Sequence, residues 1–492
     1  MENSVWLKPT NGENKANFKK QLMKSLMKDE LEATVTECIY LDTLELDLLK
    51  QNMVFMLQSR EEGVFGLLFS ECQGNELEIK EKLILPENSI SIELFGEETQ
   101  ERLNAVLAGK PLFMQCAVAF EVNAQTSGEE NQSIEASQYV CCFKDDGQKC
   151  KLYTFQLKDA SGNNSLFYET ADKLGEELNL TRCPNPFSEA LRISASGFKP
   201  LINDKYKKYK QENGLAQVFS TRVFNLINSY IWAMRQGMAK EALHKLRLQA
   251  RKTISMLEAF QSAFNTEAHT YTRLIEEILD KTGPVRTLDV LLERIQDKMQ
   301  DDPALDLNEL YEKLEKQRAE AAQAIVHEYK QGQNNDLISL WLYINRTAEL
   351  WKEGEKEKSD IKAAFSYIKD LTESLAGLKK SSFADARSIH NIRINIKKIR
   401  YFIEIMEDNP KKLRECVAIL KKLQDAYGII TDHDECIRAL YQMALSSRDN
   451  VLAYACGICT GIFTMVTQHI YKEAYPLWKE YRPLLEKLAK VL

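Results

Sequence analysis

One pattern of charged residues occurs twice in this chain of 492 residues. Residues 244–252 read His-Lys-Leu-Arg-Leu-Gln-Ala-Arg-Lys, and residues 390–398 read His-Asn-Ile-Arg-Ile-Asn-Ile-Lys-Lys. Both copies follow His-x-x-Arg-x-x-x-(Arg/Lys)-Lys and start 146 residues apart (390 − 244), and Glu258 and Glu404 follow them at the same offset. Such regular spacing predicts a duplicated structural unit that presents the same cationic surface twice. Two such surfaces facing one another would form a site for a long, highly charged anion.

The second copy places its charges on one face of a helix. At about 100° per residue, the charged positions fall within an arc of roughly 80°. These positions are His390, Arg393, Lys397, Arg400 and Glu404, with Lys398 beside the arc. The neighbouring stripe is entirely isoleucine, at positions 389, 392, 396, 399 and 403. A helix bundle would bury this apolar stripe and leave the cations at its edge, where Glu404 is expected to orient one of them.

The residue types of both copies suit phosphate. Arginine offers a planar fork of donors for bidentate contacts, lysine supplies a point charge, and a nearby polyanion favours the charged form of histidine. We therefore predict an anion site made of His244, Arg247, Arg251, Lys252, His390, Arg393, Lys397, Lys398 and Arg400. Solvated helix faces with ion pairs four residues apart are the alternative for a single copy, and the repetition argues against it. Ile254 stands where the second copy has Arg400, so we expect the second copy to contribute more charge.

Composition limits the class of protein. With 44% apolar and 28% charged residues, a net charge of −7 and a pI near 5.7, the chain resembles a soluble globular protein. A generally basic nucleic-acid binder is excluded, so any polyanion site must be local. The polar N-terminus and the 11 cysteines without disulfide-framework spacing predict a cytoplasmic protein with reduced thiols. Val451–Val466 is too short to span a membrane and is expected to be a buried helix.

Two types of pattern divide the chain. In residues 1–185, strand-like runs at 54–58, 65–69, 78–85, 139–143 and 152–157 and helical patterns at 97–107 and 165–178 predict an α+β domain with an antiparallel sheet. Residues 186–211 are expected to form a linker. From residue 212 to 492, apolar residues recur at spacings of three and four, which predicts an all-α domain with repeat halves at about 212–330 and 331–492.

Residues 212–492 resemble the conserved histidine α-helical domain, CHAD, whose signature is His-x-x-Arg-x-x-x-(Lys/Arg)-(Lys/Arg)-x-Arg in each half. A second family segment is matched by residues 420–434 and 283–289, where the resemblance implies that one helix ends and the next begins. Asp434 and Asp289 are therefore expected to be N-caps. The resemblance implies two four-helix bundles related by a pseudo-twofold axis with a basic groove between them. It also implies polyphosphate binding and an association with polyphosphate granules.

The first 185 residues resemble the CYTH, or triphosphate tunnel, fold, in which a Tyr-Phe-Asp-Thr segment is matched by Tyr40-Leu41-Asp42-Thr43. The catalytic pattern of that family is missing. The Glu-x-Glu-x-Lys opening of the family is matched by Ser4–Lys8, where only the lysine is kept. The Arg-x-Arg strand of the family is matched by Met56-Leu57-Gln58, and its late glutamates are matched by Leu152, Thr154 and Gln156. Metal-dependent triphosphate hydrolysis needs converging carboxylates and cations, so a non-catalytic domain is predicted.

Two short motifs are weaker. Glu76-Leu77-Glu78-Ile79-Lys80 spells the opening pattern at the wrong place and is expected to be a strand edge. Cys456-Gly457-Ile458-Cys459 lies in an apolar helical stretch and is expected to be a buried helix contact rather than a redox or metal motif.

The predicted function is the binding of inorganic polyphosphate through a basic groove, with no metal, cofactor or catalytic residue and no membrane partner. Nucleic acid is a disfavoured ligand. Two alternatives stay open. One is a metal-dependent inorganic triphosphatase in the N-terminal domain, which release of phosphate from tripolyphosphate would reveal. The other is a scaffold whose groove binds an acidic protein or nucleic acid.

Overall fold

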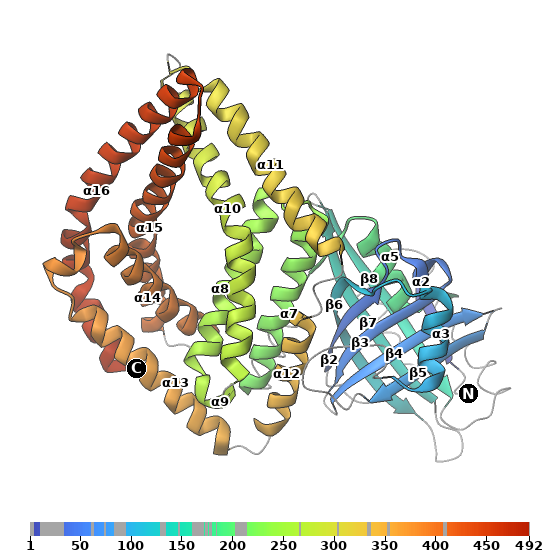
Figure 1. Ribbon diagram of the computed structural model, residues 1–492. Coiled ribbons are helices and arrows are strands. Elements are labelled where there is room, and N and C mark those ends of the chain that lie inside the picture. The colour runs from blue at the N-terminus through green and yellow to red at the C-terminus, as the bar shows by residue number, and fades with distance from the viewer. Residues whose placement is uncertain are drawn as a thin grey trace. The chain divides into compact units, whose positions relative to one another are not determined.

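The structure is a computed structural model. It describes residues 4–9, 34–60, 63–72, 75–82, 95–127, 134–145, 148–159, 172, 176, 180–183, 185–201, 214–264, 267–302, 305–331, 336–351, 355–406 and 411–491. The chain forms two compact units, residues 1–232 with 332–349 and residues 233–331 with 350–492. The first unit contains the sheet, and the second consists of helices (Figure 1). The fold is thus an α+β region followed by an all-α region, as the sequence patterns predict.

The sheet of the first unit has ten strands within the described ranges. They are β1 (Ser4–Pro9), β2 (Thr34–Asp42), β3 (Met53–Arg60), β4 (Gly63–Cys72), β5 (Asn75–Lys82), β6 (Phe113–Ser127), β7 (Ile134–Asp145), β8 (Gln148–Asp159), β9 (Leu180–Arg182) and β10 (Lys199–Leu201). Their order is β5-β4-β3-β2-β6-β7-β8-β1-β9, with β10 beside β7. Every strand pair is antiparallel. All five predicted strand runs lie in this sheet, although β5 begins earlier than predicted and its predicted end, residues 83–85, lies outside the described residues.

One face of the sheet is packed with apolar side chains. Because side chains alternate between faces along a strand, Cys38 and Tyr40 of β2 point to the same side as Val54 and Met56 of β3. Cys116, Val118, Phe120, Tyr139 and Cys141 from β6 and β7 join this core. The Tyr40 side chain is fully buried, and burial raises the pKa of its phenol well above the ordinary value.

Short helices complete the first unit. α2 (Asp47–Lys50) follows β2, and α3 (Glu97–Leu107) has the predicted bounds. α5 (Pro186–Ala195) begins at Asn185, whose side chain accepts a hydrogen bond from the Ser188 backbone N–H, and Pro186 occupies the first helical position. Residues 186–201, assigned to a linker by the sequence patterns, thus form α5 and β10, while 202–211 and most of the predicted helix 165–178 lie outside the described residues.

Helices α7 (Gly214–Arg235) and α12 (Asp336–Trp351) pack against the sheet. A buried carboxylate on β2, Glu37, accepts hydrogen bonds from Ser220 Oγ of α7 at 2.7 Å and from Trp341 Nε1 of α12 at 3.0 Å. Ser59 Oγ of β3 donates to Asn345 Oδ1 of α12 at 2.7 Å. Buried polar groups need such partners, so this network fixes both helices to the sheet.

The second unit shows the duplication in its helices. The first repeat contributes α8 (Lys240–Ala259), α9 (Gln261–Phe264), α10 (Glu267–Asp301) and α11 (Asn308–Lys330). The second contributes α13 (Glu355–Ala376), the 3₁₀ helix η2 (Lys380–Phe383), α14 (Ala386–Ile405), α15 (Lys411–Ser446) and α16 (Asn450–Val491). α8 and α14 begin 146 residues apart (386 − 240) and end 146 apart (405 − 259), which is the offset of the sequence motif.

α16 is the one helix in the described ranges that is long and apolar enough to cross a membrane, and a third of its most apolar window is buried. Its inner face carries Cys456 and Cys459, which are buried beside Leu452 and Phe463, as predicted for the C-x-x-C motif. Its outer face exposes Tyr454 and Met465, so the predicted buried helix is buried on one side only.

Candidate functional site

Helices α8 and α14 lie against each other and carry the two motif copies. The N-cap of α14 is Asp385, whose side chain accepts a hydrogen bond from the Ser388 N–H at 2.7 Å. The predicted isoleucine stripe of α14 is buried, and so are Leu243, Leu246 and Ala250 on α8. Burial of these apolar stripes fixes the rotation of both helices and turns the cations toward the space between them.

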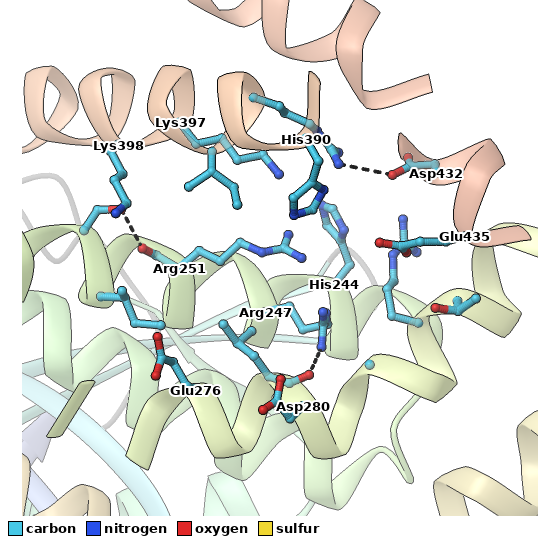
Figure 2. Close-up of a pocket in the computed structure, with 18 of the residues that line it drawn as sticks. His244, Arg247, Arg251, Glu276, Asp280, His390, Lys397, Lys398, Asp432 and Glu435 are labelled. Atoms are coloured by element: carbon cyan, nitrogen blue, oxygen red, sulfur yellow. Dashed lines mark hydrogen bonds and ion pairs between the residues drawn. The ribbon is translucent and has the colours of Figure 1, made fainter. Parts of the chain in front are cut away.

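A cavity of about 750 Å³ lies between α8, α10, α14 and α15 (Figure 2). Seven of the nine predicted site residues line it: His244, Arg247, Arg251, His390, Arg393, Lys397 and Lys398. They come from both repeats, so the cavity joins the two motif copies into one site. All of its lining residues belong to the second compact unit.

The structure does not bring the other two predicted residues, Lys252 and Arg400, to this cavity. Lys252 Nζ lies 2.7 Å from Glu404 Oε2, and Arg400 Nη1 lies 3.4 Å from Glu404 Oε1. Both cations also lie over the Tyr401 ring. Glu404 therefore orients cations, as its place on the helical arc predicts.

Ion pairs across α8 and α14 are reciprocal. Lys252 of α8 pairs with Glu404 of α14, and Lys398 of α14 pairs with Glu258 of α8 at 2.9 Å. Each residue of one pair is 146 positions from its counterpart in the other (398 − 252 and 404 − 258). Such exchange is typical of a twofold axis passing between two equivalent elements, so the duplication in sequence is also a local symmetry.

The first arginine of each motif is anchored to the neighbouring long helix. Arg247 Nη1 donates to the Leu279 carbonyl and, at 2.7 Å, to Thr282 Oγ1 of α10. Arg393 Nη1 donates to Thr431 Oγ1 of α15 at 2.6 Å and lies 3.3 Å from Asp432 Oδ1. Burial is the main cause that lowers the pKa of Arg247 to about 10. These contacts hold both guanidinium groups at the cavity wall.

Gly428 of α15 makes room for one of these arginines. A Cβ atom at this position would lie 3.2 Å from Arg393 Nη2. Such a contact is tight enough to displace the guanidinium, so glycine permits the close approach of α14 and α15 at the cavity.

Two cations, one from each repeat, lack such anchors. Within the described residues, no hydrogen bond or ion pair holds the guanidinium of Arg251 or the ammonium of Lys397. Figure 2 shows both side chains in the space between α8 and α14. Burial and then the neighbouring Arg393 and Arg251 lower the pKa of Lys397 to about 6, and burial likewise lowers the pKa of Arg251. The two side chains thus line the cavity without an ion pair in the described part of the chain.

Both motif histidines line the cavity as well. Burial is the main cause that lowers the pKa of His244 and of His390, and the neighbouring arginines lower both further. Without a bound anion the imidazoles therefore favour the neutral form. A polyanion in the cavity would reverse this preference, because opposite charge favours the protonated ring.

Sequence patterns missed one cation and the carboxylates of the cavity. Arg286 lies on α10 one turn after Thr282, and the spacing of four residues from this threonine is the signal that could have placed it on the same face. Five carboxylates also line the cavity: Glu258, Glu276, Asp280, Asp432 and Glu435. Three arginine or lysine side chains from each repeat line this cavity, so the expectation of more charge from the second repeat is not met within it. The reason is that Arg400 turns to Glu404 instead of the cavity.

The predicted N-cap roles of Asp289 and Asp434 were also wrong. Both residues lie inside continuous helices, α10 and α15. The Asp289 carboxylate is 2.9 Å from Arg318 Nε, and Asp434 pairs with Arg438 one turn later in its own helix. Cationic side chains thus neutralise these carboxylates, and the backbone continues through Pro284 in α10 without a helix end.

The sheet positions matched to the catalytic residues of the CYTH fold have a different environment. Met56 is fully buried in the apolar core, and Gln58 Nε2 donates to Cys38 Sγ at 3.6 Å. Thr154 and Gln156 are buried, and Gln156 Oε1 accepts from Tyr139 OH at 3.3 Å. Phe187 of α5 fills the middle of this core, with its ring 5.0 to 6.0 Å from those of Trp6, Phe69, Phe120 and Tyr139.

In the part of the chain that the structure describes, no group of three or more His, Cys, Asp or Glu side chains could hold a metal ion. Lys80 of the Glu76–Lys80 motif lies on β5, the last strand of the sheet path, and the side chains of Glu76 and Glu78 lie outside the described set.

Known proteins and structures match both regions. The CHAD domain family matches residues 224–440. The CHAD domain of the plant Ricinus communis is 20% identical, covering 55% of this chain and 91% of its own, with a TM-score of 0.43. PptA from Streptomyces chartreusis is 18% identical, covering 54% and 98%, with a TM-score of 0.41.

HpAC1 from Hippeastrum, described as an adenylyl cyclase with a dominant triphosphatase activity, is 12% identical, covering 39% and 96%, with a TM-score of 0.28. No curated protein sequence matches this chain. The family match at residues 224–440 includes both motif copies, α8 and α14 and most of the cavity wall. This chain therefore contains a CHAD domain.

Proposed function

We propose that the CHAD domain binds inorganic polyphosphate in the cavity between α8, α10, α14 and α15. The observation that carries this proposal is the pair Arg251 and Lys397, which face one cavity from the two repeats without a counter-ion among the described residues. A half-buried cation without an ion pair costs free energy, and a phosphate oxygen would lower that cost.

The chemistry of the wall favours phosphate over other anions. Arg247 and Arg393 are each fixed by hydrogen bonds from one Nη atom of the guanidinium. Guanidinium groups held in this way present donors at defined positions, which suits tetrahedral phosphate groups spaced along a chain. Binding that neutralises phosphates releases counter-ions, so the affinity should fall steeply with salt.

A net charge of −7 supports a local site rather than a general affinity for nucleic acid. Duplex DNA would need a broad basic surface, whereas the cations here line a cavity that also holds five carboxylates. We propose a cytoplasmic protein that can associate with polyphosphate granules, with no cofactor and with inorganic polyphosphate as its partner.

For the N-terminal unit we propose a non-catalytic role. Its core is closed by aromatic rings around Phe187, and Glu37 of β2 binds α7 and α12 on the other side of the strand. Around Phe187 the described core is apolar, and Gln58 and Gln156 form hydrogen bonds inside the protein, so this core offers no carboxylate ligands for Mg²⁺. This packing supports a structural domain that anchors two helices.

The test is a titration of the purified chain with long-chain polyphosphate, tripolyphosphate and duplex DNA, at two salt concentrations and with or without Mg²⁺, while free phosphate is measured. We expect salt-sensitive binding that favours the long chain, without phosphate release. Stronger binding of DNA, or of an acidic protein, would replace polyphosphate as the ligand. Release of phosphate from tripolyphosphate would contradict the non-catalytic role of the sheet.

A further inference from the structure

A second cavity of about 660 Å³ adjoins the first. Its lining residues are Ala386, Arg387, His390, Thr431, Asp434, Glu435 and Arg438, from α14 and α15. Two of them, His390 and Glu435, also line the first cavity. The two spaces therefore meet at these two side chains.

The cations of α14 form one row through both cavities. Arg387, His390, Arg393 and Lys397 follow one another at spacings of three or four residues, which places them on one face of the helix. The predicted motif begins at His390, and Arg387 extends it by one turn. On α15, Arg438 lies one turn beyond Glu435 and faces the same second cavity.

This extension exists in the second repeat alone. The position 146 residues before Arg387 is Glu241, which pairs with Lys245 on the exposed surface of α8. On the long helices, Thr282 and Thr431 play equivalent roles toward Arg247 and Arg393, 149 residues apart (431 − 282). By the same offset Glu435 corresponds to Arg286, so the two ends of the cavity differ in charge.

The extra cations can accept a ligand at little cost. Within the described residues the Arg387 side chain has no hydrogen bond or ion pair, and it is exposed. Arg438 pairs with Asp434, but 71% of its side chain is exposed. Exposed ion pairs contribute about 0–1 kcal/mol, so a phosphate could replace this carboxylate readily.

We propose that the anion site continues from the first cavity into the second, with the phosphate chain passing between His390 and Glu435 and ending on Arg387 and Arg438. This inference rests on the proposed function and deepens it. A short phosphate fits within the first cavity, whereas a long chain reaches both, so the second cavity sets the preference for long chains. Glu435 opposes the passage, because it is an exposed carboxylate at the junction without an ion pair in the described part of the chain.

The test compares the double variant Arg387→Ala/Arg438→Ala with the wild type. Its affinity for long-chain polyphosphate should fall about tenfold, and the slope of log affinity against log salt should decrease by about 1.5 for two lost phosphate contacts. The affinity for tripolyphosphate should stay unchanged. In the reverse direction, Glu435→Gln should raise the affinity for the long chain by about threefold, since a like charge at the junction is removed.

Matched controls come from α10. Arg273 and Glu277 form an exposed ion pair four residues apart, as Asp434 and Arg438 do, and neither residue lines the first or the second cavity. Arg273→Ala and Glu277→Gln should change neither affinity. An equal loss for both phosphate ligands, or no change in Arg387→Ala/Arg438→Ala and Glu435→Gln, would overturn the extension. If the wild type itself does not bind long-chain polyphosphate, the proposed function fails instead.

Discussion

The interior of the sheet and the cavity of the helical unit differ in the side chains that line them. The sheet closes its interior with Phe187, Tyr139 and other apolar residues, whereas the helical unit has a cavity lined with arginine and lysine. In the sheet, polar side chains such as Gln58 find partners within the protein. In the cavity, the side chains of Arg251 and Lys397 have no hydrogen bond or ion pair within the described residues.

Within the helical unit, neighbouring lysines of one motif differ in whether they form ion pairs. Lys252 and Lys398 occupy equivalent positions and are both neutralised by glutamates across the local twofold axis. Lys397, one residue before Lys398, has no such partner in the described ranges. Neighbouring lysines of one motif therefore differ, since Lys398 pairs with Glu258 of the other repeat and Lys397 lines the cavity without an ion pair in the described ranges.

The largest expected effect is on the free energy of unfolding of the unit that contains the sheet. Phe187→Ala removes the ring that fills its core, and such buried truncations cost about 3–5 kcal/mol of unfolding free energy. We expect the denaturation midpoint of the first unit to fall, while the affinity for polyphosphate under native conditions stays unchanged. Denaturant unfolding followed by circular dichroism measures the first, and titration measures the second.

A control for this variant is Leu445→Ala, at a leucine that is 65% exposed on α15 and should change the free energy of unfolding by less than about 0.5 kcal/mol. Loss of polyphosphate binding in folded Phe187→Ala protein would show that the sheet takes part in the site, and would break the comparison between the two regions.

A smaller effect concerns pH. Burial, Arg393 and Arg251 lower the pKa of Lys397 to about 6, while Asp432 of α15 opposes them weakly. A bound polyanion raises this pKa, so binding takes up a proton. The affinity should therefore rise as the pH falls from 8 and level off near pH 6, by about tenfold for each unit of pKa shift. The lowered pKa values of His244 and His390 act in the same direction.

The matched variant is Lys397→Arg, which stays charged throughout this pH range. It should bind at pH 8 more tightly than the wild type and lose most of the pH dependence. Titrations at pH 6, 7 and 8 separate the two proteins. An affinity that is independent of pH, or that falls on acidification, would contradict the role of Lys397.

Sequence predicted much of the fold and most of the site. The isoleucine stripe of α14 fixed which face is buried, and the repeat offset of 146 residues placed α8 and α14 as equivalents. Strand alternation likewise located β3, β4 and β7. These predictions were correct because each depends on a periodicity within a single helix or strand.

The errors arose where two elements meet. Arg400 and Lys252 share the motif with the cavity residues, and only the contact of α8 with α14 reveals that Glu404 holds both. Asp434 and Asp289 lie inside continuous helices, where they pair with Arg438 of the same helix and with Arg318 of another helix. Arg286 and Glu435 join the site through packing that no single motif records.

The central claim is that the cavity, and not basic residues in general, binds polyphosphate. The most direct measurement compares Arg251→Ala/Lys397→Ala with Lys252→Ala/Arg400→Ala, since each pair removes one arginine and one lysine of the two motifs. The affinity for long-chain polyphosphate is measured at two salt concentrations near pH 6. We predict a loss of about 100-fold with a flatter salt dependence for the first variant, and little change for the second. Equal losses in both variants, or none in the first, would contradict the account.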